Sequence, residues 1–134
     1  MVNVEEADYI LRREMEMLEQ RLYLSELFNI YGPLLTEKQQ RCLTMHLFDD
    51  FSLSEIGADL QVSRQAVYDI LHRSEQTMME YEEKLGLAKR IQDERQVLDK
   101  VYDEISKLAD TADAGRVKDI LEQLAPYVSA AQEE

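Results

Sequence analysis

One short segment near the middle of the chain carries the side chains best suited to recognising another macromolecule. Arg64 and Gln65 stand at the start of a predicted helix, where contacts with base edges commonly fall. An Arg guanidinium can pair with guanine, and a Gln amide can pair with adenine. Tyr68 and His72 follow one turn further along, and Arg73 is placed to touch a phosphate. The chemistry expected here is recognition by hydrogen bonds.

Two short helices joined by a tight turn are predicted to present these side chains. Ser52 and Glu55 stand in the Ser-x-x-Glu order of a capping box, ahead of an apolar pattern at helical spacing. Ser63 is the expected cap of the second helix. The inner stripe of that helix consists of Val67, Ile70 and Leu71.

The turn between these helices has the residues that a helix-turn-helix motif needs, with one departure. Two helices that cross steeply require a small residue at the crossing, which Gly57 or Ala66 can supply. Val62 can supply the apolar residue inside the turn. The departure is Gln61, because Gly or Asn usually takes the left-handed backbone at this position.

A third helix is predicted before the motif. Thr36 and Gln39 form a second capping box and open a helix that runs to about Phe48. Such a motif needs a third helix to bury its apolar stripe, so the sequence predicts a compact trihelical unit.

Residues 5–31 are predicted to form one long helix, which Gly32 and Pro33 end. Its apolar residues repeat at 4-3-4 spacing and are Leu11, Met15, Leu18 and Leu22. A helix of this length runs about 40 Å, which a small domain cannot cover alone. We expect a partner helix from a second chain, with packing inside the chain as the alternative.

The C-terminal third is predicted to form a helical hairpin. The second helix of the motif is expected to continue beyond Ser74, and Gly86 either ends that helix or weakens it. A heptad seam follows, then a loop of small residues at 110–115 and a short helix interrupted at Pro126. The seam residues are Ile91, Leu98, Ile105 and Ala112. This hairpin either folds back within the chain or meets a partner.

The composition sets the class and limits the ligands. With four Gly, two Pro and little strand-like alternation in 134 residues, the chain is expected to be all-α. We divide it into a long N-terminal helix that serves dimerisation (1–33), a helix-turn-helix domain (34–86) and the hairpin (87–134). The formal net charge of −13 is spread over the whole chain and opposes non-specific binding to polyanions.

Residues suited to catalysis or metal binding are sparse. His46 and His72 lie 26 residues apart without a Cys or paired carboxylates nearby, and Ser63 has no neighbouring His base. We therefore expect no enzyme activity, metal or cofactor. The single Cys42 suits a reducing cytoplasm and is expected to be a buried, inert thiol. We identify no signal peptide and no membrane-spanning run.

Three stretches resemble the YlxM family of bacterial helix-turn-helix proteins: LFNIYGPLLTEKQQ, DDFSLSEIGADLQVSRQAVYDILHRSE and YEEKLGL. The resemblance covers roughly Leu24 to Leu87. Members of this family resemble region 4 of primary sigma factors and are commonly encoded beside genes of the signal recognition particle. The resemblance implies an all-α fold, a homodimer and a regulatory role in the signal-recognition-particle pathway. The contact residues it implies are Ser63, Arg64, Gln65, Tyr68, Asp69, His72 and Arg73.

Three functional hypotheses follow. In the first, the chain is an adaptor that binds a protein or RNA component of the signal recognition particle. In the second, it is a transcription regulator that reads a specific DNA sequence. In the third, the trihelical unit is a protein-docking scaffold that contacts no polyanion, and Arg64 and Arg73 pair with carboxylates.

Overall fold

The computed structural model describes residues 1–108 and 113–128, and the described part consists of helices, turns and loops without a strand. The all-α prediction is confirmed. The chain separates into two compact units, Met1–Gly86 and Leu87–Glu134, and each is described by itself.

The first unit begins with α1 (Val4–Tyr31), the long helix predicted from the sequence. The Asn3 side chain accepts a hydrogen bond from the Glu6 backbone amide at 2.8 Å and caps this helix. At its other end α1 passes into a single 3₁₀ turn, Gly32–Leu34, which contains Pro33. Proline lacks the backbone donor that the α-helical ladder requires, so the helix stops here.

The trihelical core consists of α2 (Glu37–Leu47), α3 (Leu53–Leu60) and α4 (Arg64–Leu85). Both predicted capping boxes are present, Thr36 with Gln39 at α2 and Ser52 with Glu55 at α3. Each box satisfies backbone donors that the first turn of a helix leaves unpaired. The side chains that these helices bury almost completely are Cys42, Leu43, Ile56, Val67 and Met78.

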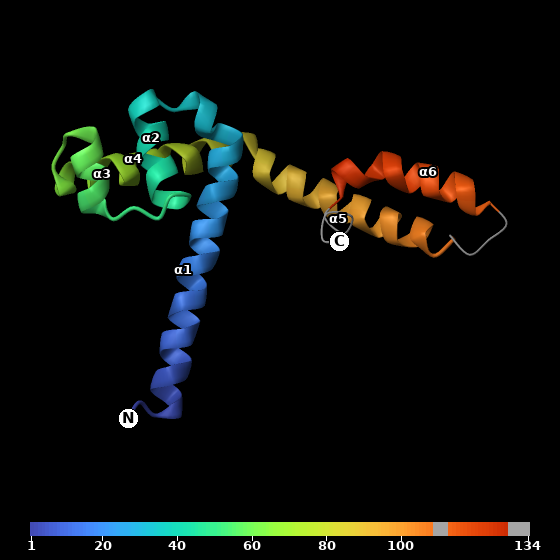
Figure 1. The fold of residues 1–134 in the computed structure, drawn as a ribbon, viewed down its shortest axis with the longest axis horizontal. Coiled ribbons are helices and arrows are strands. Elements are labelled where there is room, and N and C mark those ends of the chain that lie inside the picture. Colours follow the sequence, from blue (N-terminus) through green and yellow to red (C-terminus); the bar gives the residue numbers. More distant parts are fainter. Residues whose placement is uncertain (109–112, 129–134) are drawn as a thin grey trace. The chain divides into compact units, whose positions relative to one another are not determined.

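The second half of α1 packs against this core as a fourth helix. Leu24, Leu27 and Tyr31 are buried, and the Tyr31 hydroxyl donates to Glu82 Oε2 on α4 at 2.7 Å. The first half of α1 extends away from α2, α3 and α4, and every residue from 1 to 20 is exposed (Figure 1). One continuous helix therefore has a packed half and an uncovered half.

The second unit is a hairpin of α5 (Leu87–Ser106) and α6 (Ala114–Leu124), which pack against each other as antiparallel helices (Figure 1). Gly86 takes a left-handed backbone with φ 61° and ends α4, so α4 and α5 are separate helices. Of the predicted heptad seam, Leu98 and Ile105 are partly covered while Ile91 is exposed, and Ala112 lies outside the described residues. The predicted loop at 110–115 ends earlier than expected, because Ala114 and Gly115 already belong to α6.

Candidate recognition face

The start of α4 is fixed by its cap and by the turn before it. The Ser63 hydroxyl accepts a hydrogen bond from the Ala66 backbone amide at 3.0 Å, as predicted for a helix cap. Gln61 takes the left-handed conformation with φ 58° and ψ 44°, although it is neither Gly nor Asn. The Val62 amide donates to the Gly57 carbonyl at 2.9 Å and closes the turn.

Gly57 is the small residue at the crossing of α3 and α4. A Cβ added to it would lie 2.8 Å from the Val62 carbonyl oxygen and 3.5 Å from Cγ2 of Val67. Backbone atoms at that distance cannot yield as a flexible side chain can, so only Gly fits. The crossing places Val62 in a partly buried position inside the turn.

The buried side chains of α4 determine which side of this helix faces the core and which side faces solvent. Val67, Leu71, Ser74 and Met78 recur at helical spacing and are buried. The Ser74 hydroxyl donates to the Ile70 carbonyl at 2.6 Å, so this buried polar group is satisfied inside the helix. Ile70, predicted for the inner stripe, is only partly covered.

We define the recognition face as the exposed outer side of α4, formed by Arg64, Gln65, Tyr68, Asp69, His72 and Arg73. The sequence pattern places all six on one side of the helix, with Ser63 directly before them. The Tyr68 and His72 rings stack with centroids 6.2 Å apart and an interplanar angle of 3°. The Gln65 amide donates to Asp69 Oδ1 at 3.3 Å.

The two arginines of this face are available to a ligand. Within residues 1–108 and 113–128, neither Arg64 nor Arg73 forms a salt bridge. Pairing of these arginines with carboxylates of the chain itself is thus not found in the described part of the chain. A guanidinium that is not already paired can form two parallel hydrogen bonds with guanine, phosphate or a carboxylate.

The charge around the face is unlike that of a general nucleic-acid binder. Residues 1–86 contain eight Lys and Arg against 17 Asp and Glu. On the recognition face itself, Asp69 offsets part of the charge of Arg64 and Arg73. A polyanionic ligand at this face would therefore gain little from bulk attraction and would depend on specific contacts.

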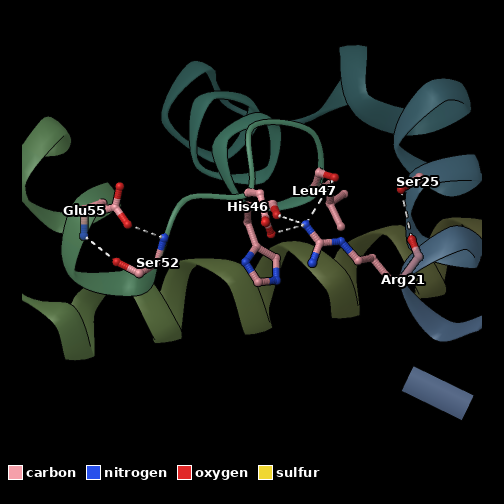
Figure 2. A network of polar contacts seen from close by, with 7 residues as sticks. Arg21, Ser25, His46, Leu47, Ser52 and Glu55 are labelled. Atoms are coloured by element: carbon pink, nitrogen blue, oxygen red, sulfur yellow. Dashed lines mark hydrogen bonds and ion pairs between the residues drawn. The ribbon is translucent and has the colours of Figure 1, made fainter. Parts of the chain in front are cut away.

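A polar network that the sequence did not predict ties α1 to the end of α2 (Figure 2). Arg21 Nη2 donates to the His46 carbonyl at 2.6 Å, and it lies 3.4 Å from the Leu47 carbonyl and 3.3 Å from Asp50 Oδ1. The last carbonyls of a helix lack intrahelical donors and carry partial negative charge, so a cation there is favourable. Arg21 supplies this cation from another helix, and no local motif marks it.

A hollow of about 260 Å³ opens beside this network, between α1, α2 and α4. Its lining residues are Met17, Gln20, Arg21, Leu24, His46, Leu47 and Glu75. Burial lowers the pKa of His46, and the nearby Arg21 lowers it further while Asp50 opposes both effects. Burial raises the pKa of Glu75 against the opposing attraction of His72. Both groups therefore favour their neutral forms more than they would in water.

Other predicted features occupy ordinary structural positions. Cys42 is buried as expected, and burial raises the pKa of its thiol. In the described ranges, no three His, Cys, Asp or Glu side chains gather where they could bind a metal ion. None of the described helices combines the length and the apolar character needed to cross a lipid bilayer.

Comparisons with known proteins agree with the helix-turn-helix geometry. Residues 18–120 match the family described as "Putative helix-turn-helix protein, YlxM / p13 like". A UPF0122 protein of Geobacillus kaustophilus is 42% identical over 91 residues, which cover 68% of this chain and 83% of that protein. A UPF0122 protein of Bacillus pumilus is 39% identical over 107 residues, covering 80% and 97% respectively. This chain therefore belongs to the YlxM / p13-like family of helix-turn-helix proteins.

Proposed function

We propose that this protein is a regulatory adaptor of the signal-recognition-particle pathway, which binds a protein or RNA component of the particle through its recognition face. The observation that carries the proposal is the presentation of Arg64, Tyr68 and Arg73 on a rigidly held helix. The choice of pathway rests on the YlxM family, whose members are commonly encoded beside genes of the signal recognition particle.

The charge of the protein favours a partner with its own basic surface. An acidic body is attracted to a basic protein or ribonucleoprotein surface and repelled by bare nucleic acid. Long-range attraction of this kind raises the association rate, and the close contacts of the recognition face then provide specificity. A protein component of the particle, or RNA partly neutralised by such a component, fits these requirements.

The proposed adaptor is a cytoplasmic homodimer. The single buried Cys42 makes no intramolecular disulfide and suits a reducing compartment. The uncovered half of α1 offers a surface for a second chain. Two copies of the recognition face would strengthen binding to a particle that offers two sites, because the second contact becomes intramolecular.

Mixing the purified protein with the reconstituted particle tests this proposal. We expect co-elution in size-exclusion chromatography and a changed rate of GTP hydrolysis by the GTPase of the particle. Arg64→Ala is expected to weaken co-elution, while Arg41→Ala, on α2 and away from the recognition face, leaves it unchanged. Neither co-elution nor a change in GTP turnover at micromolar protein would contradict the proposal.

The second candidate is a transcription regulator that reads duplex DNA. The observation that favours it is the position of Arg64 and Gln65 at the exposed start of α4, where recognition helices contact base edges. Selection from random duplexes should then recover a defined site whose binding is lost in Arg64→Ala and Gln65→Ala. Failure to select any site would remove this candidate. Binding driven by phosphate contacts should also fall steeply as salt rises.

A further inference from the structure

The two sides of α1 differ in what they contact. Leu24, Leu27 and Tyr31 face the core and are buried. Leu22 is 60% exposed, although it lies only two residues before Leu24. At about 100° per residue, Leu22 points roughly opposite to these three residues. The helix therefore carries a second apolar side that faces away from its own core.

This second side is a continuous stripe over the uncovered half of α1. We call it the outer stripe, and its members are Leu11, Met15, Leu18 and Leu22, each between 55% and 60% exposed. Their 4-3-4 spacing is that of the seam along which two helices interlock. Much of the stripe lies before or at the edge of the family match, which begins at residue 18.

The outer stripe is complementary to a second copy of itself in antiparallel orientation. Rotation about a two-fold axis between Met15 and Leu18 sets Leu11 against Leu22 of the other copy and Met15 against Leu18. Arg12 and Glu19 lie on the same flank of the stripe and are exposed. In this register, Arg12 of one copy and Glu19 of the other lie at nearly the same height along the paired helices. The offset along the helix axis is about 3 Å.

Charge and shape both favour the antiparallel arrangement. In a parallel pair, the acidic ends of the two helices, with Glu5, Glu6 and Asp8, would lie side by side and repel. The antiparallel pair separates them, and the like-charged approaches that remain are those of Glu5 and Asp8 of one copy to the level of Glu26 of the other. The outer stripe faces away from the core, so a second helix that lies along it is on the side opposite to α2, α3 and α4. Residues 4–10 of that second helix continue to the level of residues 23–29 of α1.

We propose that the outer stripe of α1 is a self-association surface on which a second copy of this chain binds through the same residues in antiparallel orientation. The proposal specifies the surface of the homodimer included in the proposed function. It stands apart from partner binding, because the outer stripe and the recognition face lie on different helices. The two trihelical cores then sit on opposite sides of the paired helices.

A matched pair of substitutions in the full-length chain tests the proposal. Met15→Glu places a charge in the outer stripe, whereas Tyr9→Glu places the same charge on the opposite side of α1, away from the hollow beside Arg21 and Glu75. Met15 and Tyr9 are 55% and 63% exposed, so neither change should disturb the core. Circular dichroism melting checks that both variants keep the wild-type fold.

Sedimentation equilibrium then gives the mass of each protein. We expect the wild type at about 50 µM to have twice the 15.7 kDa chain mass. Met15→Glu should weaken association by about tenfold or more, because it buries an unpaired charge, and Tyr9→Glu should resemble the wild type. A monomeric wild type, as would result if the hairpin of the same chain covered the outer stripe, would overturn the proposal. Equal weakening by both substitutions would do the same.

Disulfide trapping tests the orientation. In the antiparallel register, the double variant Leu11→Cys with Leu22→Cys should form covalent dimers on oxidation, while Leu11→Cys alone should not. Efficient trapping of Leu11→Cys alone would indicate a parallel pair and contradict the register. Because Arg64→Ala should leave the mass unchanged, loss of partner binding and loss of self-association can be told apart.

Discussion

The inner and outer sides of α4 differ in their surroundings: the inner side packs against the core, and the outer side is exposed. Val67, Leu71 and Met78 are buried against α2, α3 and α1, and they fix the position of the helix. Arg64, Tyr68 and Arg73 are exposed on the other side, and no packing requirement explains them. If the outer side is the binding surface proposed above, fold and recognition are separable in this protein. Substitutions on the inner side should change stability, and those on the outer side should change binding alone.

The largest expected effect comes from placing the same charge on each side in turn. Val67→Asp buries an unpaired carboxylate and should destabilise the first unit by more than about 3 kcal/mol, enough to unfold it. Tyr68→Asp, one residue further, should cost no more than about 0.5 kcal/mol because Tyr68 is exposed. Thermal melting followed by circular dichroism measures both. Similar melting temperatures for the two variants would show that α4 is not oriented as described.

The contact between α3 and the inner side of α4 is tested by Gly57→Ala. The added methyl group meets the Val62 carbonyl oxygen, so we expect a loss of about 1–3 kcal/mol despite the better helix propensity of Ala. Gly115→Ala is the matched control, since no atom of the described residues lies within 4 Å of its Cβ position. Urea unfolding of both variants gives the comparison. A stabilised Gly57→Ala variant would contradict the close crossing.

Removing the cap of α3 should have a smaller effect. Ser52→Ala removes the hydroxyl that accepts a hydrogen bond from the Glu55 backbone amide at 3.1 Å. The free energy of unfolding should fall by about 1 kcal/mol. Ser54→Ala, at an exposed position of the same helix, should cost less than about 0.5 kcal/mol. The difference between the two urea midpoints measures the cap. Equal midpoints would mean that the capping box contributes nothing.

The smallest effect concerns the two titratable groups in the hollow at the edge of the core. Because the pKa of His46 is lowered in the folded state, the unfolded chain takes up a proton first as pH falls below about 6.5, and stability falls. The raised pKa of Glu75 acts in the opposite direction, with stability present at low pH and lost as pH rises through its folded pKa.

Single substitutions separate these two contributions. Urea midpoints at pH 7.5 and 5.5 should show a smaller decrease on acidification in His46→Gln than in the wild type, and a larger decrease in Glu75→Gln. A wild-type decrease that neither substitution alters would assign the pH dependence to other groups.

The features that could be predicted from sequence are local ones. The capping boxes at Thr36 and Ser52 and the cap at Ser63 depend on residues three positions apart, so the sequence contains them in full. The grouping of Arg64, Tyr68 and the other outer residues on one side of α4 follows from helical periodicity.

Features that depend on distant residues could not be predicted. Arg21 caps α2 from 25 residues away, and the hydrogen bond of Tyr31 to Glu82 spans 51 residues.

The left-handed backbone of Gln61 departs from its residue preference, because the tight turn between α3 and α4 requires that conformation. The sequence leaves open whether Gly86 ends α4 or only weakens it, and the positive φ of Gly86 shows that α4 ends there.

The most direct test of the account is to compare the binding of an outer-side variant with its stability. Tyr68→Ala with Arg73→Ala should reduce the affinity for the reconstituted signal recognition particle by about tenfold or more, with a melting temperature and sedimentation mass like those of the wild type. Isothermal titration calorimetry on the two proteins measures this difference. Unchanged affinity in a folded double variant would contradict the assignment of the outer side of α4 as the binding surface.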